Sequence, residues 1–303
     1  MSNIVFFGTP EFAVPILKKL IKSNFKIKAV FTQPPRRSNR GQKILKSHIH
    51  LFAEKYNLNI RVPEKLINEE TYLKNLNCDL ALVVAYGQII PSHFLKFCKH
   101  GYINIHASLL PKYRGAAPIQ RSIMNFEKNT GISFMKINEK LDSGPVSNIY
   151  KMKIQKNENS LSLSQRLSKL ASKKIVENLN LIISGEARFI DQDDSISTYA
   201  NKIDKTESKI NWKKKADEII AQINGLYPNA WFKFQDERYK ILECDKSELQ
   251  GNPGHVLNND LTVACGINSI AIKKIQRQGK KPQNIKEFIL GNKIKRGSIL
   301  IDV

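Results

Sequence analysis

Short apolar segments alternate with amphipathic stretches over the first 188 residues. The continuous apolar runs at 4–7 and 80–85 are typical of strands buried on both faces of a sheet. Apolar residues spaced by three or four positions between 13 and 21 predict a helix. This alternation predicts an α/β fold, a Rossmann-like open sheet of mostly parallel strands with right-handed crossovers. Further strands are expected at 26–31, 60–62, 101–106, 132–137 and 146–154, and further helices at 49–56, 68–76, 91–97, 118–126 and 160–184.

The pattern changes after residue 188. It fades from 189 to 205, as in a linker, and one more helix is expected at 216–224. Short β-like segments separated by turn residues then predict a small antiparallel barrel. We therefore expect an α/β domain over 1–188, a linker over 189–205 and a barrel domain over 206–303. The expected strands of the barrel are 230–234, 239–243, 254–257, 261–264 and 270–275.

The net charge of +22 indicates a polyanionic partner, such as nucleic acid, an anionic membrane surface or a phosphorylated substrate. A chain rich in Lys, Asn and Ile could also carry this excess as scattered, solvated charge, but the basic residues are partly clustered. The expected loop at 32–46 has no acidic residue and holds Arg36, Arg37, Arg40, Lys43 and Lys46. The segment 269–298 has one acid, Glu287, and nine basic residues: Lys273, Lys274, Arg277, Lys280, Lys281, Lys286, Lys293, Lys295 and Arg296.

The cysteines form no recognisable metal-binding motif. Cys78, Cys98, Cys244 and Cys265 include no CxxC pair, and no histidine lies at ligand spacing from them. We therefore expect no metal and reduced, mostly buried thiols, as in a cytoplasmic protein. The first residues lead directly into a strand, which predicts no signal peptide, and the apolar run at 80–86 is too short to cross a membrane.

The segment 101–118 carries the clearest candidate chemistry. Asn104 and His106 are two residues apart on an expected strand, so their side chains point to one face. Asp142 lies on an expected turn between two later strands, where its carboxylate could hold the protonated imidazole of His106. Amide and imidazole donors aimed at one point suit a carbonyl oxygen that becomes negative in a tetrahedral intermediate. No Ser or Cys is paired with His106, so the nucleophile would belong to the substrate, although such an Asn-x-His pair is more often structural.

Longer motifs cover nearly the whole chain. The run NIHASLLPKYRGAAPIQR resembles the signature of the 10-formyltetrahydrofolate-dependent formyltransferases, and its RGAAPIQR part resembles the branch of that family that acts on tRNA. Five further segments resemble the same family in order: IVFFGTPEFAVPIL, VFTQPPRRSNRGQK, VVAYGQIIP, TGISFMKINEKLDSG and KINWKKKADEIIAQINGLYP. The chain departs from the family where DTGD is common, because Asp142 is kept but Pro145 replaces the second Asp.

The resemblance implies a catalytic site and two substrates. Asn104, His106 and Asp142 would form the catalytic trio. The formyl group would come from 10-formyltetrahydrofolate, and the accepting α-amine from methionyl-initiator tRNA. The turn that would contact the folate consists of Ser108, Leu109, Leu110 and Pro111.

The resemblance also gives the two basic regions a role. The loop at 32–46 would be an insertion that reaches the acceptor end of the tRNA, with Arg40 as its key arginine. The C-terminal domain would be an OB-like barrel that holds the tRNA from outside. We expect a monomer, since nothing in the sequence demands an oligomer. The expected tRNA contacts are Arg36, Arg37, Arg40, Lys43, Lys273, Lys274, Arg277, Lys280 and Lys281.

Two other functions stay open. A formyl-folate enzyme that uses a nucleotide sugar, a purine precursor or water as acceptor would not need two basic surfaces. A noncatalytic RNA-binding protein on the same scaffold would not need Asn104, His106 and Asp142 together. A dinucleotide or NTP site is not supported, because the turn after the first strand contains only Gly8 and matches neither GxGxxG nor GxxxxGK.

Overall fold

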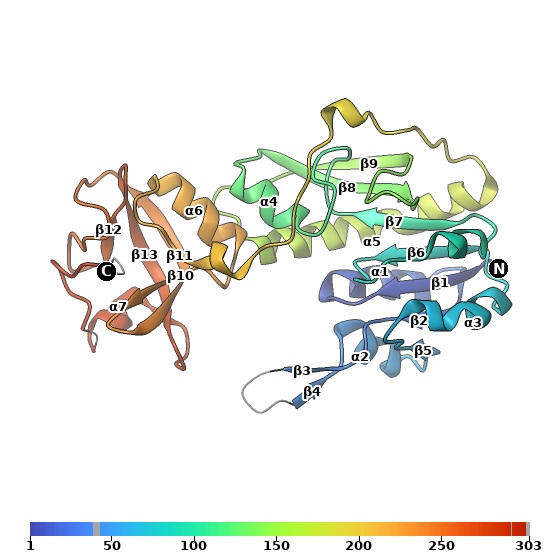
Figure 1. Cartoon of the computed structure of the whole chain (residues 1–303), viewed down its shortest axis with the longest axis horizontal. Helices are drawn as coiled ribbons and strands as arrows, with labels where there is room; N and C mark the ends of the chain where they lie inside the picture. Colours follow the sequence, from blue (N-terminus) through green and yellow to red (C-terminus); the bar gives the residue numbers. More distant parts are fainter. Residues whose placement is uncertain (39–42, 292, 301–303) are drawn as a thin grey trace. The chain divides into compact units, whose positions relative to one another are not determined.

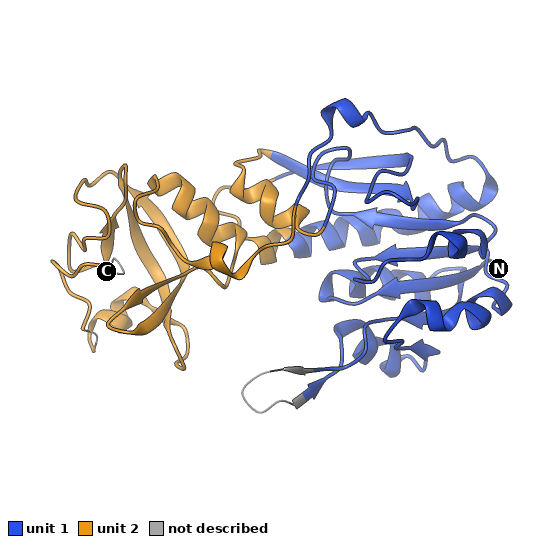
Figure 2. Cartoon of the chain, viewed as in Figure 1, with its two compact units in different colours: residues 1–115, 129–153, 164–200 blue, residues 116–128, 154–163, 201–303 orange. Residues whose placement is uncertain are grey.

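The structure is a computed structural model that describes residues 1–38, 43–291 and 293–300. It contains two compact units (Figure 2). Unit 1 consists of residues 1–115, 129–153 and 164–200, and unit 2 consists of residues 116–128, 154–163 and 201–303. Each unit is therefore assembled from three stretches of chain.

Unit 1 is built on a seven-stranded sheet with the order β5-β2-β1-β6-β7-β8-β9 (Figure 1). Its parallel strands are β1 (Asn3–Gly8), β2 (Lys26–Phe31), β5 (Ile60–Arg61), β6 (Leu80–Val84) and β7 (Tyr102–His106). Two antiparallel strands, β8 (Asn129–Lys136) and β9 (Val146–Lys153), complete the sheet. This arrangement confirms the predicted open, mostly parallel α/β sheet.

Both faces of the sheet are covered, as the apolar strands require. On one face, α5 (Ser160–Ser184) lies against α1 (Val14–Ile21) and its preceding turn, because the Ser168 hydroxyl donates to the Phe12 carbonyl at 2.6 Å. On the other face, η2 (Leu66–Glu69), α3 (Glu70–Asn75) and η3 (Ser92–Lys96) supply apolar residues to a buried cluster around Phe7 and Tyr102. Helix α2 (His48–Lys55) follows the basic segment.

The segment expected to be a plain loop at 32–46 contains a short hairpin. Strand β3 (Arg36–Ser38) pairs antiparallel with β4 (Lys43–Leu45). Each strand has three residues, which is too short for hydrophobic alternation to identify it in the sequence. Arg36, Arg37 and Lys43 lie on this hairpin, whereas Arg40 lies outside the described residues.

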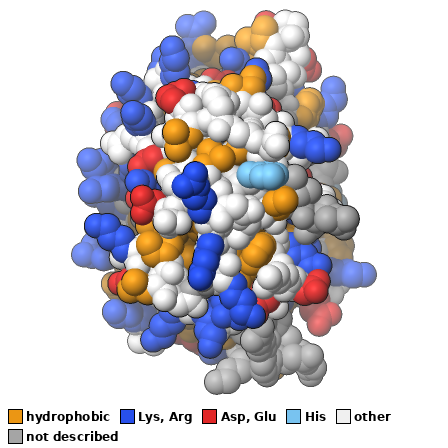
Figure 3. Space-filling model, turned by 90° about the vertical axis from the view of Figure 1, so that its left-hand side faces the viewer, with side chains coloured by type: hydrophobic (Ala, Val, Ile, Leu, Met, Phe, Trp, Pro, Cys, Tyr) orange, Lys and Arg blue, Asp and Glu red, His pale blue; other side chains and the backbone are white. Residues whose placement is uncertain are grey.

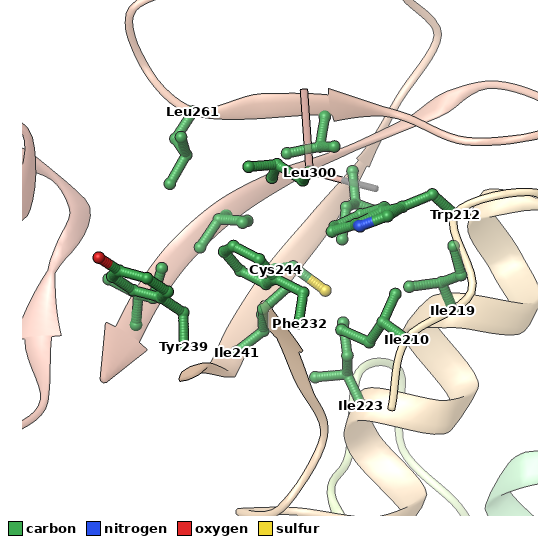
Figure 4. Packing of buried hydrophobic residues seen from close by; sticks show 14 of the residues in the cluster. Ile210, Trp212, Ile219, Ile223, Phe232, Tyr239, Ile241, Cys244, Leu261 and Leu300 are labelled. Carbon is green, nitrogen blue, oxygen red and sulfur yellow. The ribbon is translucent and has the colours of Figure 1, made fainter. Parts of the chain in front are cut away.

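Unit 2 contains an antiparallel half-barrel. Its sheet has the order β10-β11-β13-β12, formed by β10 (Trp231–Phe234), β11 (Glu237–Ser247), β12 (Thr262–Ala264) and β13 (Ser269–Arg277), and β14 (Gln283–Asn284) also pairs with β13. Trp212, Phe232, Ile241 and Leu300 pack in its core (Figure 4). The antiparallel prediction is confirmed, but 254–257 makes only isolated bridges to other segments instead of a strand, and α7 (Ile285–Ile289) was not foreseen.

Two helices of unit 2 pack closely against each other. Helix α4 (Pro118–Met124) meets α6 (Ala216–Gly225), which begins where the sequence predicted a helix. A Cβ atom at Gly225 would lie only 2.5 Å from Cγ of Met124. The absence of a side chain at Gly225 therefore permits this approach.

The prediction of four free cysteines is wrong for one pair. Cys78 and Cys98 form a disulfide, with their Cα atoms 5.0 Å apart. These residues precede β6 and β7, so the pairing of two neighbouring parallel strands brings together cysteines that are 20 positions apart in sequence. Cys244 and Cys265 are free and buried, as expected.

Residues 1–38, 43–291 and 293–300 contain neither a membrane-spanning helix nor a cluster of metal ligands. No helix there has the length and apolar character needed to cross a bilayer. Nor do these ranges contain three or more His, Cys, Asp or Glu side chains grouped so that they could hold a metal ion.

Candidate active site

The three predicted catalytic residues come together at the end of β7. Nδ2 of Asn104 donates to Oδ1 of Asp142 at 3.3 Å, and Nδ1 of His106 lies 3.6 Å from Oδ2 of the same carboxylate. Ile103 and Ile105, which alternate with the two polar residues, are buried on the opposite face. The pleat of one short strand thus supplies two polar groups, and the β8–β9 connection brings the acid to them.

The imidazole of His106 faces an acceptor at each nitrogen. Its Nε2 lies 2.7 Å from the carbonyl oxygen of Tyr113, which can only accept a hydrogen bond. Its Nδ1 faces the Asp142 carboxylate, in ion-pair range but too far for a direct hydrogen bond. Each ring nitrogen thus has an oxygen partner, the Tyr113 carbonyl for Nε2 and the Asp142 carboxylate for Nδ1. His106 is 6% exposed, which fixes its orientation.

Backbone groups hold Asp142 in an uncommon conformation. Its φ of +45° lies in the left-handed region, which non-glycine residues seldom adopt. The Gly115 N–H donates to Oδ2 of Asp142 at 2.9 Å. Gly144, two residues later, has no room for a side chain, because a Cβ atom there would lie 1.9 Å from the carbonyl oxygen of Lys136. The backbone of the β8–β9 connection therefore holds the Asp142 carboxylate in one position.

The predicted folate turn divides into buried and accessible residues. The Ser108 hydroxyl donates to the Lys112 carbonyl at 2.6 Å, and the Leu110 N–H donates to the Ser133 hydroxyl at 3.1 Å. Ser108 and Leu110 are buried, and the peptide bond between Leu110 and Pro111 is cis. Leu109 and Pro111 are partly exposed, so they are the members of the turn with surface to offer a ligand.

Neighbouring strands end at the same edge of the sheet as His106. The Thr9 hydroxyl, after β1, donates to the Tyr86 carbonyl, after β6, at 2.7 Å. The Gln33 side chain, after β2, donates to the same carbonyl at 3.3 Å. Ligands of open α/β sheets bind beyond the carboxyl ends of the strands, and β1 and β6 flank the point where the strand order reverses. The sequence reasoning singled out neither Thr9 as a ligand nor Gln33, although their positions after strands were a usable signal.

A further segment contacts both loops of the site. We call residues 190–200, which follow α5 and are coloured yellow-green to yellow in Figure 1, the strap. At its start, Ile190 exchanges two backbone hydrogen bonds with Val146. At its end, the Arg114 N–H donates to the Thr198 carbonyl and the Ala200 N–H donates to the Arg114 carbonyl, at 2.9 and 2.7 Å. The strap thus ties the chain beside Asp142 to the chain before Gly115.

Side chains of the strap extend this connection. The amide of Gln192 donates to the Asp142 carbonyl at 2.9 Å and to the Gly144 carbonyl at 2.7 Å, and accepts from Nε of Arg114 at 3.0 Å. Arg114 also pairs with Asp194 at 2.7 Å, although its side chain is only 2% exposed. The sequence reasoning missed Gln192 and this role of Arg114, because the strap has no periodicity and its partners lie far away in the chain.

Comparison with known proteins decides the family. The formyl transferase family matches residues 2–179, and the formyl transferase C-terminal domain matches residues 202–293. A methionyl-tRNA formyltransferase of Pelagibacter ubique is 57% identical over 308 aligned positions, covering 100% of this chain and 99% of the relative. The chain belongs to the methionyl-tRNA formyltransferase family. A relative of that name from Ruegeria pomeroyi is 40% identical and covers 98% of this chain and 100% of its own length.

Solved structures show the same fold at lower identity. A sugar 3N-formyltransferase, solved with dTDP and 5-N-formyl-THF, is 21% identical with a TM-score of 0.68, covering 93% of this chain and 99% of its own. HypX from Aquifex aeolicus, solved with tetrahydrofolic acid, is 14% identical with a TM-score of 0.67, covering 96% of this chain and 47% of its own. At these identities the similarity concerns the fold alone. The enzyme therefore shares its scaffold with proteins whose structures contain folate compounds.

The predicted tRNA-binding residues of this formyltransferase differ in their surroundings. On the hairpin, Arg36 donates to the Gln33 side chain at 2.9 Å. In unit 2, Arg277 forms two hydrogen bonds with Glu237, at 2.7 and 2.6 Å, and Lys273 lies 3.6 Å from Asp245.

The remaining lysines of that set are less engaged. Within the described ranges, no carboxylate lies at salt-bridge distance from Lys274, Lys280 or Lys281. Figure 3 shows many Lys and Arg side chains along the edges of the visible face, with fewer Asp and Glu among them. These three lysines therefore have charge available for a polyanion.

Proposed function

We propose that the enzyme transfers the formyl group of 10-formyltetrahydrofolate to the α-amine of methionyl-initiator tRNA. The observation that carries the mechanism is that one carboxylate, Asp142, contacts Asn104 and faces His106 at the end of β7. No protein nucleophile belongs to this group. We therefore infer that the amine of the charged tRNA attacks the formyl carbon directly.

Asn104 and His106 are proposed to stabilise the oxyanion. As the amine attacks, the formyl oxygen gains negative charge, and the Asn104 amide and a protonated His106 would donate to it. The Asn104 amide has two hydrogens and uses one on Asp142, so the second is available. Removal of a single oxyanion donor typically lowers kcat about 10²–10³-fold.

Asp142 is proposed to have two tasks. Its negative charge stabilises the protonated ring of His106, which faces a second acceptor at Tyr113. It would also help to take the proton that the attacking amine loses, directly or through water. Collapse of the tetrahedral intermediate would then break the bond between the formyl carbon and N10 of the folate, and N10 would take up a proton as tetrahydrofolate leaves. The Gly115 N–H and Asn104 bonds leave the carboxylate oriented for both tasks.

The two substrates would be held by different parts of the chain. We expect the folate to lie against the turn at 108–111, with Leu109 and Pro111 making the contacts because Ser108 and Leu110 are buried. Arg36, Arg37 and Lys43 of the hairpin, Arg40 from the same basic segment of the sequence, and the lysines of unit 2 would position the tRNA through its phosphates. One chain supplies every residue named here, so we expect a monomer to be active, in the cytoplasm where charged tRNA occurs.

The experiment supplies 10-formyltetrahydrofolate with methionyl-initiator tRNA, free methionine or an amino-sugar nucleotide, and follows formyl transfer. We expect transfer to the charged tRNA only. Transfer to the sugar nucleotide instead would reject the proposed acceptor. His106→Ala should collapse turnover while tRNA affinity stays nearly unchanged, because the ring acts in the transition state. An equal loss of tRNA affinity would show that His106 has another role.

A further inference from the structure

The side-chain amide of Gln192 forms three hydrogen bonds with residues around Asp142. Both N–H groups of Nε2 are used, one on the Asp142 carbonyl and one on the Gly144 carbonyl, at 2.9 and 2.7 Å. Its Oε1 accepts from Nε of Arg114 at 3.0 Å. Only an amide of this length offers two donors and one acceptor from a single side chain, so neither Glu nor Leu can reproduce the set.

The contacts of Gln192 fall on both sides of the carboxylate. The Asp142 carbonyl belongs to the residue held at a φ of +45°, and the Gly144 carbonyl closes the same connection. Arg114 is the residue directly before Gly115, whose N–H holds Oδ2 of Asp142. One side chain therefore fixes the backbone of Asp142 and, through Arg114, the chain that carries the donor to its carboxylate.

The anchor of this arrangement is buried. The Arg114 guanidinium is 2% exposed and bridges Gln192 to Asp194, both on the strap. The Asp194 carboxylate is 69% exposed, so this pair is buried only on its Arg114 side, where loss of the Gln192 oxygen would leave a buried guanidinium N–H without its acceptor. The strap therefore provides a rigid base against which the Asp142 turn is set.

We propose that Gln192 is a positioning residue for the reaction, which holds the Asp142 carboxylate at the distance it needs from Asn104 and His106. This inference rests on the catalytic role proposed for Asp142. Gln192 touches no reacting atom and acts only through that carboxylate. A displacement of about 1 Å in a catalytic group can lower turnover about 10²-fold.

The test compares Gln192→Glu with Gln155→Glu, the same change at an exposed glutamine of unit 2. Gln192→Glu keeps an acceptor for Arg114 but removes both donors and places negative charge beside two carbonyl oxygens. We expect kcat to fall about 10–100-fold with KM for both substrates nearly unchanged. Gln155→Glu should keep the kcat of the unaltered enzyme. If Gln192→Glu does not fold, Gln192→Leu replaces it, with the same loss expected.

A double-mutant cycle with Asp142→Asn separates positioning from general support of the fold. If Gln192 acts through Asp142, the change at 192 should cost less than about threefold once Asp142→Asn is present. Losses that multiply would overturn the proposal, as would a folded Gln192 variant with unchanged kcat and only a lower unfolding temperature. If Asp142→Asn alone leaves kcat unchanged, the proposed role of Asp142 in formyl transfer fails instead.

Discussion

Gly115 donates its backbone N–H to Oδ2 of Asp142 at 2.9 Å, across 27 positions of sequence. Both residues have positive φ, +111° at Gly115 and +45° at Asp142. A backbone donor cannot change rotamer, so it fixes the carboxylate more firmly than a long side chain would. The main chain thus fixes the position of the Asp142 carboxylate independently of any side-chain rotamer.

Asp142→Asn should nearly abolish turnover while the fold is kept. The replacement has almost the same shape, and its oxygen can still accept from the Gly115 N–H. It lacks the negative charge that faces His106 and cannot accept the proton of the amine. We expect kcat to fall about 10²–10⁴-fold, measured by single-turnover formylation. Asp260→Asn, at an exposed position of unit 2, is the matched control, and equal activity of the two variants would contradict the role of Asp142.

Gly131→Ala should displace Leu109 in the turn that is predicted to contact the folate. A Cβ atom at Gly131 would lie 2.2 Å from the Tyr150 carbonyl and 2.5 Å from Cδ2 of Leu109. Such overpacking typically costs about 1–3 kcal/mol. We expect that loss in urea unfolding, together with a raised KM for the folate because Leu109 must move. Gly291→Ala, where a Cβ atom meets nothing within 4 Å, should change neither quantity.

Lys274, Lys280 and Lys281 should contribute more to tRNA affinity than Arg277, whose charge is paired with Glu237. Replacing any of the three by Ala should weaken binding and lower the slope of log K against log salt by about one. Arg277→Ala should change that slope less. Salt titrations of tRNA binding measure both, with folate affinity as the internal control. A larger change of slope for Arg277→Ala than for the three lysine variants would contradict the prediction.

The pair between Arg121 and Glu207 should make stability depend on pH in the acid range. Nη1 and Nη2 of Arg121 lie 2.5 and 2.9 Å from the Glu207 oxygens, and the hydrogen bond from Arg121 lowers the pKa of Glu207 from its usual 4.5. A lowered pKa stabilises the fold above the unfolded value and loses that contribution as pH falls through the folded one. Glu207→Gln should therefore cost about 1 kcal/mol at pH 7 and progressively less below about pH 4.5.

The unfolding temperatures of the unaltered enzyme and of Glu207→Gln, measured between pH 7 and pH 3, test this prediction. Glu177→Gln, in the exposed pair with Lys174, is the matched control and should leave the unfolding temperature nearly unchanged at every pH. A constant difference for Glu207→Gln across the whole range would mean that its charge is not the cause.

The four cysteines should differ in their reaction with iodoacetamide. Burial raises the pKa of Cys244 and of Cys265 to about 12, so little thiolate is present at pH 8. We expect no alkylation of the native enzyme, two labelled cysteines after unfolding without reductant, and four after unfolding with it. Mass spectrometry reports the count, and four labels without reductant would show that Cys78 and Cys98 are not joined.

Local patterns in the sequence predicted most of the sheet and the placement of Asn104 and His106 on one face of a strand. The apolar run at 80–85 became β6 because a strand buried on both faces has no polar positions. Asn104 and His106 share a face because the pleat alternates. Both predictions depend on neighbours in the chain, which is the information that a sequence displays directly.

The missed features depend on partners that are distant in sequence. Gln192 binds Asp142 across 50 positions and Arg114 across 78, and a polar stretch without periodicity gives no sign of such contacts. Cys78 and Cys98 meet only because β6 and β7 are neighbours in the sheet. Helix α7 has five residues, fewer than a helical pattern needs to be recognised.

Unit 2 is built from three separate stretches of chain, which limits how related enzymes can exchange domains by recombination. A fragment that starts at residue 206 would lack α4, and the surface of α6 around Gly225, which packs on Met124, would be left bare. Recombination at a single junction would therefore join an α6 from one parent to an α4 from another. Unit 2 could be inherited intact only if residues 116–128 and 154–163 were inherited together with residues 201–303.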